Sequence, residues 1–234
     1  KNLKKIYSFH KMKRHILYSF RRCPYAIRAR WALRESLVKV EIREVDLKNK
    51  PVDLIRKSQY KTVPLLILKN GEIIEESLDI ILWALSNSKK VDLKKYFPNN
   101  FKEDILSIIR ENDQEFKFHL DRFKYASRFN EKDKDIHFHE AQKIIKKWNL
   151  TLNNNSKSNV WLVGNNETIA DWCIWPFLRQ FKIACESQKI SNYFDEPMIR
   201  WLNYFETNYI YKDVMNKYNI WDESSKVSYY PLNI

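Results

Sequence analysis

Glycine and cysteine are scarce in this sequence, which has 2 glycines and 3 cysteines in 234 residues. So little glycine excludes a glycine-rich RNA-binding signature, and no zinc-finger spacing is present either. The cysteines, Cys23, Cys173 and Cys185, are odd in number and far apart. We therefore expect no disulfide framework.

Long apolar runs are also missing. No segment approaches the roughly 18 consecutive apolar residues that a membrane span requires. The first fourteen residues contain no apolar block like that of a signal peptide. The chain is therefore expected to be soluble and cytoplasmic, with no membrane partner.

Acidic residues are absent from positions 1–14, which carry six of the basic residues of a chain whose net charge is +13. In the rest of the chain, basic residues outnumber acidic ones by seven and are scattered rather than clustered. No basic region joined to a heptad repeat is present. Such a leader attracts phosphate weakly. We nevertheless do not expect nucleic-acid binding.

The organising stretch is the tripeptide Cys23-Pro24-Tyr25. The apolar run 15–20 before it predicts a strand, and residues 24–37 after it predict a helix with apolar positions at helical spacing. Proline is favoured at the first helical position, so Pro24 marks Cys23 as the N-cap or its neighbour. Cys23 therefore lies where a strand gives way to a helix.

This position has chemical consequences for Cys23. Unpaired backbone N–H groups and the positive end of the helix dipole favour thiolate, and cysteines so placed have pKa values of about 3.5–7.5. Arg21, Arg22 and Arg28 add positive charge, and nothing apolar surrounds Cys23 in the sequence. The hypothesis is a reactive thiolate; the alternative is a small buried hydrophobic residue.

The next residues complete an α/β domain. Residues 38–47 alternate as a strand does, 52–57 suit a short helix, and 63–68 and 72–74 form a hairpin about Asn70-Gly71. Ser77 is suited to cap the helix that follows. The predicted order is βαβ, a connecting helix, and then ββα.

Beyond residue 86 the patterns are helical. Residues 101–120 and 141–152 each follow one helix face, Thr168 and Asp171 form a capping box that opens another helix, and shorter helices are expected over 193–218. The domain prediction is a basic leader at 1–14, an α/β domain at 15–86, a linker at 87–100 and an all-helical domain at 101–234.

Five short motifs, in order over about 150 residues, carry a family resemblance. They are Cys23-Pro24-Tyr25-Ala26, Leu47-Lys48-Asn49-Lys50-Pro51, Val63-Pro64, Glu76-Ser77 and Thr168-Ile169-Ala170-Asp171. Together they resemble glutathione S-transferases, and the cysteine resembles the omega class and its bacterial relatives. The resemblance implies a thioredoxin-like first domain and a helical second domain, the glutathione S-transferase fold.

The resemblance also implies roles for these residues. Cys23 would be catalytic, and the glutathione-binding set would be Tyr25, Lys50, Val63, Glu76 and Ser77. Pro24, a cis Pro64, Thr168 and Asp171 would be structural. Four of these residues have plainer alternatives: Pro64 as a trans proline, Ser77 as a simple cap, Glu76 as a solvated carboxylate and Lys50 as a surface lysine. Glutathione would serve as co-substrate, and no metal is expected.

The motif departs from other classes at two positions. Cys23 stands where other classes have the serine or tyrosine that activates glutathione, and a cysteine at that position favours disulfide exchange. Position 26 is alanine, so the chain lacks a Cys-x-x-Cys motif and a dithiol reaction cycle is not expected. The functional hypothesis is a glutathione-dependent thiol transferase or reductase that acts on a small disulfide or electrophile, in a homodimer. Its reaction would be disulfide exchange, deglutathionylation or reductive removal of glutathione from a conjugate, each through a mixed disulfide of Cys23 with glutathione. The alternative is a non-catalytic binding module of the same fold.

Other chemistry-bearing residues have plainer readings. We expect Cys173 and Cys185 in the core and His137 and His139 on the surface, with no metal set. Phe116, Trp172 and Trp175 are interpreted as core, with a substrate cleft as the alternative.

Overall fold

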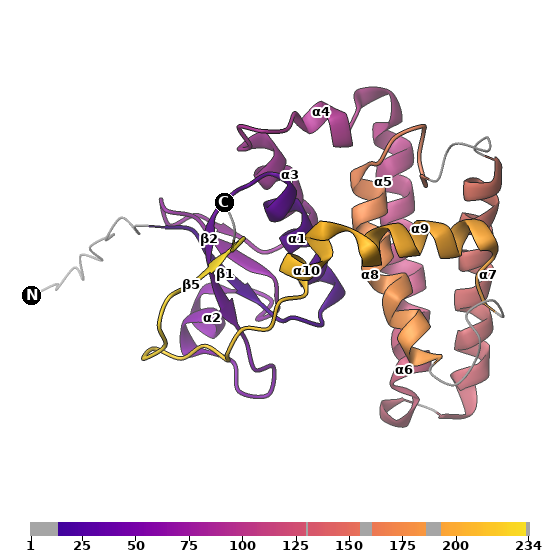
Figure 1. Cartoon of the computed structure of the whole chain (residues 1–234). Coiled ribbons are helices and arrows are strands. Elements are labelled where there is room, and N and C mark those ends of the chain that lie inside the picture. The colour runs from indigo at the N-terminus through magenta and orange to yellow at the C-terminus, as the bar shows by residue number, and fades with distance from the viewer. Residues whose placement is uncertain (1–13, 130, 155–160, 186–192, 233–234) are drawn as a thin grey trace, which may run out of the picture. The chain divides into compact units, whose positions relative to one another are not determined.

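The structure is a computed structural model that describes residues 14–129, 131–154, 161–185 and 193–232 (Figure 1). The chain forms two compact units, one of Lys1–Ala84 with Asp213–Ile234 and one of Leu85–Lys212. We call them the sheet unit and the helical unit. The basic leader, apart from Arg14, lies outside the described residues.

The elements of the sheet unit follow the predicted order. They are β1 (Ile16–Ser19), α1 (Pro24–Glu35), β2 (Val40–Glu44), α2 (Val52–Lys57), β3 (Leu65–Ile67), β4 (Ile73–Ile74) and α3 (Ser77–Ser86). The prediction of βαβ, a connecting helix and ββα is therefore confirmed, with boundaries shifted by a few residues.

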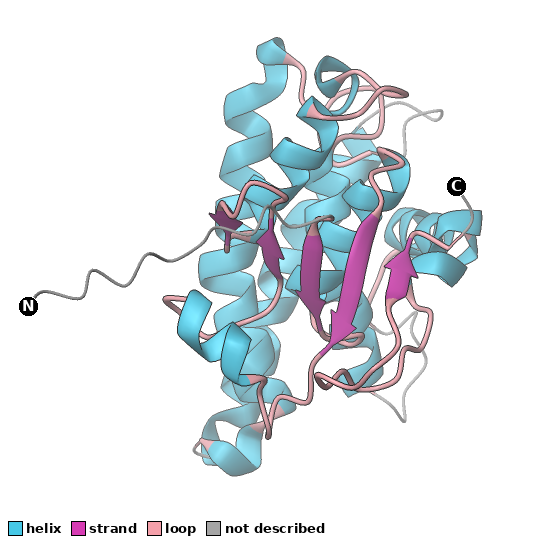
Figure 2. Cartoon of the chain, turned by 90° about the vertical axis from the view of Figure 1, so that its left-hand side faces the viewer, coloured by secondary structure: helices cyan, strands magenta, loops and turns pink. Residues whose placement is uncertain are grey.

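The strands form one mixed sheet in the order β4-β3-β1-β2-β5, drawn side by side in Figure 2. β1 and β2 are parallel, with Ile16 opposite Glu41, whereas β3 is antiparallel to β1. All four residues of β1 are buried, as expected for a central strand. Because β1 leads directly to α1, Cys23 lies just beyond the carboxyl end of the central strand.

The fifth strand corrects the predicted domain boundary. β5 (Ser228–Tyr230) pairs antiparallel with β2, and residues from Asp213 onward belong to the sheet unit. The predicted all-helical domain at 101–234 is therefore wrong at its C-terminal end. Tyr230 is fully buried and its hydroxyl donates to the Arg30 carbonyl at 2.6 Å, so packing fixes a strand too short for a sequence period to reveal.

The helical unit contains helices only, within its described residues. They are α4 (Leu93–Tyr96), η1 (Asn99–Phe101), α5 (Lys102–Glu111), the π-helical η2 (Asn112–Phe116), α6 (Lys117–Lys124), η3 (Ala126–Arg128), η4 (Glu131–Asp133), α7 (Lys134–Asn154), α8 (Ile169–Ala184), α9 (Glu196–Thr207) and most of α10 (Tyr209–Val214), whose last two residues belong to the sheet unit. The predicted linker at 87–100 thus contains α4 and most of η1. Helices α5 and α6 follow one another through η2 and both pack against α8, α6 also packs along α7, and α9 crosses α7 and α8 (Figure 1).

Aromatic side chains fill the core of the helical unit. Phe116, Trp172 and Trp175 are each fully buried, and Trp175 stacks on Phe205 with ring centroids 5.6 Å apart. These residues are therefore core, as predicted. Cys173 is buried as predicted, while Cys185 is half-buried at the end of α8. Burial raises the pKa of the Cys185 thiol to about 11.

The predicted capping box at the start of α8 is confirmed. The Ala170 N–H donates to Thr168 Oγ1 at 3.3 Å, and the Thr168 N–H donates to Asp171 Oδ2 at 2.8 Å. The other carboxylate oxygen accepts from the Leu162 N–H at 3.0 Å and from Trp201 Nε1 at 2.9 Å. Burial raises the pKa of Asp171 to about 6, and these hydrogen bonds offset part of that shift.

Replacing Asp171 with asparagine is expected to lower the free energy of unfolding by about 1–3 kcal/mol, because an amide NH₂ would face a buried N–H that then has no acceptor. Chemical denaturation measures this loss. Asp195→Asn is the matched control, since Asp195 is an exposed N-cap that makes no side-chain capping bond. Equal stability of the two variants would contradict a structural role for the Asp171 network.

Two histidines of the helical unit form a pair that the sequence did not predict. Nδ1 of His119 on α6 lies 2.9 Å from Nδ1 of His137 on α7, and both rings are half-buried. His137, predicted on the surface, is thus half-buried and paired, whereas His139 is exposed as expected. The pair arises because α6 packs along α7.

This pair predicts a pH dependence of stability. The pKa of His119 is lowered from its ordinary 6.5, first by burial and then by His137. The unfolded chain consequently binds a proton more readily than the folded one, and stability present above pH 6.5 is lost as pH falls below it. We expect the stability advantage of wild type over His119→Gln to shrink between pH 7.5 and 5, measured by denaturation at each pH. A pH-independent difference would contradict this.

The described helices include none that is both long and apolar enough to cross a membrane.

Candidate functional site

Cys23 occupies the N-cap of α1, as predicted. Its backbone is extended, its N–H donates to the Phe20 carbonyl at 3.0 Å, and its carbonyl accepts from the Ile27 N–H at 2.9 Å. Pro24 stands at the start of the helix, and the Cys23 side chain makes no capping bond. The thiol is therefore next to the positive end of the helix without being committed to capping it.

The surroundings of Cys23 are more apolar than its sequence neighbours. With Phe20 and Trp221 it packs, half-buried, against a cluster of buried side chains of the sheet unit. That cluster consists of Ile16, Tyr18, Val45, Leu54, Val63, Leu65 and Ile67. The expectation of no apolar surroundings was wrong, because β1, α2, β3 and residues next to β2 and β3 supply these contacts.

Val63 meets Cys23 directly. The Val63-Pro64 peptide bond is cis, as the resemblance implied. The Cys23 thiol donates to the Val63 carbonyl oxygen, with Sγ 3.6 Å from that oxygen. Cys23 and Val63, which are 40 positions apart in the sequence, are therefore in direct contact in the sheet unit.

Arg28 connects two further predicted residues. It is buried, its Nε donates to Ser77 Oγ at 2.9 Å, and its guanidinium carbon lies 4.8 Å from the centre of the Tyr25 ring. Arg28 was expected to supply charge to Cys23. Its bond to Ser77 joins α1 to the start of α3.

Ser77 is the first residue of α3 and is buried. The Ile80 N–H donates to the Glu76 carbonyl at 3.0 Å, so Glu76 rather than Ser77 holds the capping position. The Glu76 side chain is exposed. Glu75 faces elsewhere, since its Oε1 accepts from Ser58 Oγ at 2.5 Å.

Lys50 reaches the loop that leads to Val63. Its Nζ donates to the Lys61 carbonyl at 2.9 Å, and the residue is half-buried. Cys23, Tyr25, Lys50, Val63, Glu76 and Ser77 therefore all belong to the sheet unit. Thr168 and Asp171 belong to the helical unit, where they form the capping box described above.

Arg30 has a larger role than the sequence suggested. It is buried, and donates from Nε to the Val214 carbonyl at 2.8 Å, from Nη2 to the Arg21 carbonyl at 2.8 Å, and from Nη1 to Ser19 Oγ and the Phe20 carbonyl. Burial lowers the pKa of Arg30, while Tyr230, Glu44 and Cys23 raise it. Arg30 therefore anchors the turn before Cys23.

Glu44 completes this anchor from β2. Its Oε1 accepts from the Arg21 N–H at 2.7 Å, and its carbonyl accepts from the Trp221 N–H at 2.9 Å. Burial raises the pKa of Glu44, and the bond from Arg21 followed by the charge of Arg30 opposes that rise. No local sequence pattern identifies Glu44 or Trp221, because their contacts join segments far apart in the chain.

Metal-ligating side chains do not gather anywhere in the described part of the chain: no three His, Cys, Asp or Glu form a group that could hold an ion.

Known proteins resemble this chain in both sequence and fold. A family model described as "Glutathione S-transferase, N-terminal domain" matches residues 17–90. Glutathione S-transferase omega-1 of Rattus norvegicus is 26% identical over 167 residues, which are 71% of this chain and 66% of the rat protein.

Solved structures match over most of the chain. The tau class glutathione S-transferase from mango, Mangifera indica, has a TM-score of 0.72 and 21% identity, with 87% of this chain and 93% of that one covered. Ure2p in complex with S-hexylglutathione has a TM-score of 0.76 and 15% identity, covering 87% and 98%. Residues 17–90 therefore match the N-terminal domain family of glutathione S-transferases, and the chain as a whole has the glutathione S-transferase fold.

Proposed function

We propose that this protein is a glutathione-dependent thiol transferase or reductase of an omega-like type, with Cys23 as the nucleophile. The similarity to rat omega-1 supports the omega-like assignment. Structures of similar fold determined with glutathione or S-hexylglutathione support the choice of ligand. A homodimer is part of the proposal.

The observation that carries the proposal is the distance of 3.6 Å between Cys23 Sγ and the Val63 carbonyl oxygen. Glutathione is extended, and its cysteinyl backbone would pair with Val63 as an added strand. That pairing would replace the thiol's contact with the carbonyl. It would also hold the glutathione sulfur beside Cys23, at the N-terminus of α1.

Three other side chains would hold the ends of glutathione. Lys50 would meet the glycyl carboxylate as a point charge, and Glu76 would accept from the γ-glutamyl ammonium. Ser77 and the first N–H groups of α3 would bind the γ-glutamyl carboxylate. Arg28, bonded to Ser77 Oγ, would hold that hydroxyl in place, and Tyr25 would cover the thiol.

The chemistry is thiol–disulfide exchange. The Cys23 thiolate attacks the glutathione sulfur of a mixed disulfide, a new S–S bond forms, and the substrate leaves as a thiolate. The thiolate of a second glutathione then attacks the same glutathionyl sulfur. Oxidised glutathione departs and the Cys23 thiolate is restored, so one free glutathione is consumed for each mixed disulfide that is reduced.

Lys50→Met is expected to weaken glutathione binding about 10-fold, because one charged hydrogen bond to the glycyl carboxylate is lost. Calorimetric titration with glutathione measures the change. Lys48→Met is the matched control, since Lys48 is an exposed lysine of the same motif. Equal weakening by both substitutions would show a general charge effect and remove Lys50 from the site.

The function itself is tested by turnover. Wild type should reduce 2-hydroxyethyl disulfide in the presence of glutathione, with a rate that saturates in glutathione. Binding of glutathione without turnover of this or another small disulfide would contradict the enzyme and favour the non-catalytic module.

A further inference from the structure

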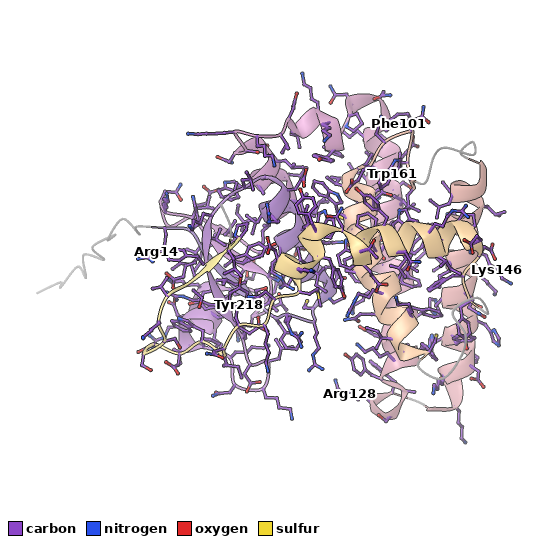
Figure 3. All side chains as sticks on the ribbon, viewed as in Figure 1. Arg14, Phe101, Arg128, Lys146, Trp161 and Tyr218 are labelled. Carbon is purple, nitrogen blue, oxygen red and sulfur yellow. The ribbon has the colours of Figure 1, made fainter. Side chains whose placement is uncertain are left out.

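A hollow lies in the sheet unit, at the opposite end of the central strands from Cys23. It has a volume of about 310 Å³ and is lined by Arg14, Lys39, Val40, Lys69 and Tyr229. Arg14 is labelled in Figure 3, at the end of the sheet unit where the chain enters β1. None of these residues belongs to the proposed glutathione site.

The sheet topology brings the three cations together. Arg14 precedes β1 and Lys39 precedes β2, and the amino ends of these parallel strands share one edge. Lys69 follows β3, whose carboxyl end lies at the same edge because β3 is antiparallel to β1. Since β3, β1 and β2 are neighbours spaced about 4.8 Å apart, the cations form a row across three strands.

Tyr229 lies beside this row on β5. The Arg14 guanidinium donates to the Tyr229 hydroxyl, and its carbon lies 5.4 Å from the ring centre. Lys39 Nζ lies 5.3 Å from the same ring centre. The ring therefore has two cations close to it and is itself partly exposed.

Acidic side chains do not balance this charge. Glu41 lies 3.7 Å from Arg14 but bonds more closely to Arg43, at 2.8 Å. Lys39 and Lys69 are exposed, and across the described ranges neither forms a salt bridge. The positive field reaches His15, whose pKa is lowered first by burial and then by Lys69.

We call Arg14, Lys39 and Lys69 the cation row. We propose that the hollow lined by the cation row binds a multiply charged phosphate anion. Its volume is at the lower end of the 300–1,000 Å³ usual for ligand pockets, which suits a diphosphate group. Arginine and lysine are the usual phosphate donors, and a single carboxylate would neutralise only part of the excess charge. The phosphate can belong to a small polyphosphate or to a nucleic-acid strand.

Titration of the full chain with inorganic pyrophosphate tests the site. The double variant Lys39→Gln/Lys69→Gln should bind at least about 10-fold more weakly than wild type, because two charged hydrogen bonds are lost. Lys90→Gln/Lys146→Gln makes the same charge change at exposed lysines of the helical unit and should bind as wild type does. Equal binding by the two double variants, or no saturable binding by wild type, would overturn the proposal.

A second arm identifies the source of the phosphate. A labelled single-stranded oligonucleotide of random sequence is titrated by fluorescence anisotropy at several salt concentrations. If it is the ligand, the Lys39/Lys69 variant should lower the slope of log affinity against log salt by about 1.4, at about 0.7 per phosphate contact. A variant effect on pyrophosphate alone supports a small ligand, and no effect on either ligand overturns the site. Glutathione affinity should be unchanged in both double variants. A failure of the phosphate-binding proposal can therefore be distinguished from a failure of the proposed glutathione-dependent function.

Discussion

Replacing Cys23 with serine is expected to lower glutathione-dependent disulfide reduction by a factor on the order of 10³ or more, as loss of a covalent nucleophile does. A serine hydroxyl does not form a disulfide, so no mixed disulfide with glutathione can accumulate. Glutathione affinity should change little, because the Val63 backbone and the side chains of Lys50, Glu76 and Ser77 are untouched. Steady-state kinetics with 2-hydroxyethyl disulfide and calorimetry with glutathione separate the two effects.

Cys185→Ser is the control for that experiment. Cys185 is also half-buried, but it lies at the end of α8 and burial raises the pKa of its thiol to about 11, so it should be unreactive at neutral pH. Full activity of Cys185→Ser is expected. A Cys23→Ser variant that keeps wild-type turnover would remove Cys23 from the chemistry.

Arg30→Met should lower the free energy of unfolding by about 3–5 kcal/mol, the usual cost of removing one partner from a buried charged network. The substitution leaves the carbonyls of Phe20, Arg21 and Val214 without the donor that joins them. Arg30→Lys should restore little, because one ammonium on a flexible stem cannot reproduce a planar fork that bonds on several sides. Chemical denaturation measures both variants.

Arg200→Met is the matched control for Arg30. Arg200 pairs with Glu196 on the surface, where more than half of each side chain is exposed, and its loss should cost no more than about 0.5 kcal/mol.

Arg30→Met should also slow the reaction of Cys23 with oxidised glutathione at temperatures where the protein remains folded, since the turn before Cys23 loses its anchor. An Arg30→Met protein as stable as Arg200→Met would contradict this role.

Local patterns in the sequence were sufficient to predict most of the helices and strands of the sheet unit. The strand before Cys23, the helix opened by Pro24 and the Asn70-Gly71 hairpin all depend on neighbouring residues, and each is present. The Thr168 capping box is a four-residue signal and is likewise confirmed. The placement of Cys23 at a helix N-cap could therefore be predicted without a structure.

Contacts between distant segments could not be predicted in this way. β5 has three residues and owes its place to pairing with β2, nearly 190 positions earlier in the chain. Arg30 and Glu44 look like ordinary charged residues until the turn before Cys23 and the C-terminal segment fold against them. The His119 and His137 pair depends on the packing of α6 against α7, which no sequence period specifies.

The most direct test of Cys23 as the nucleophile is intact-protein mass spectrometry after incubation with oxidised glutathione at neutral and mildly acidic pH, followed by peptide mapping. A single glutathione adduct that maps to Cys23, persists at mildly acidic pH and is absent from Cys23→Ser is the predicted result. No adduct, or an adduct that maps to Cys173 or Cys185 instead, would contradict the assignment of Cys23.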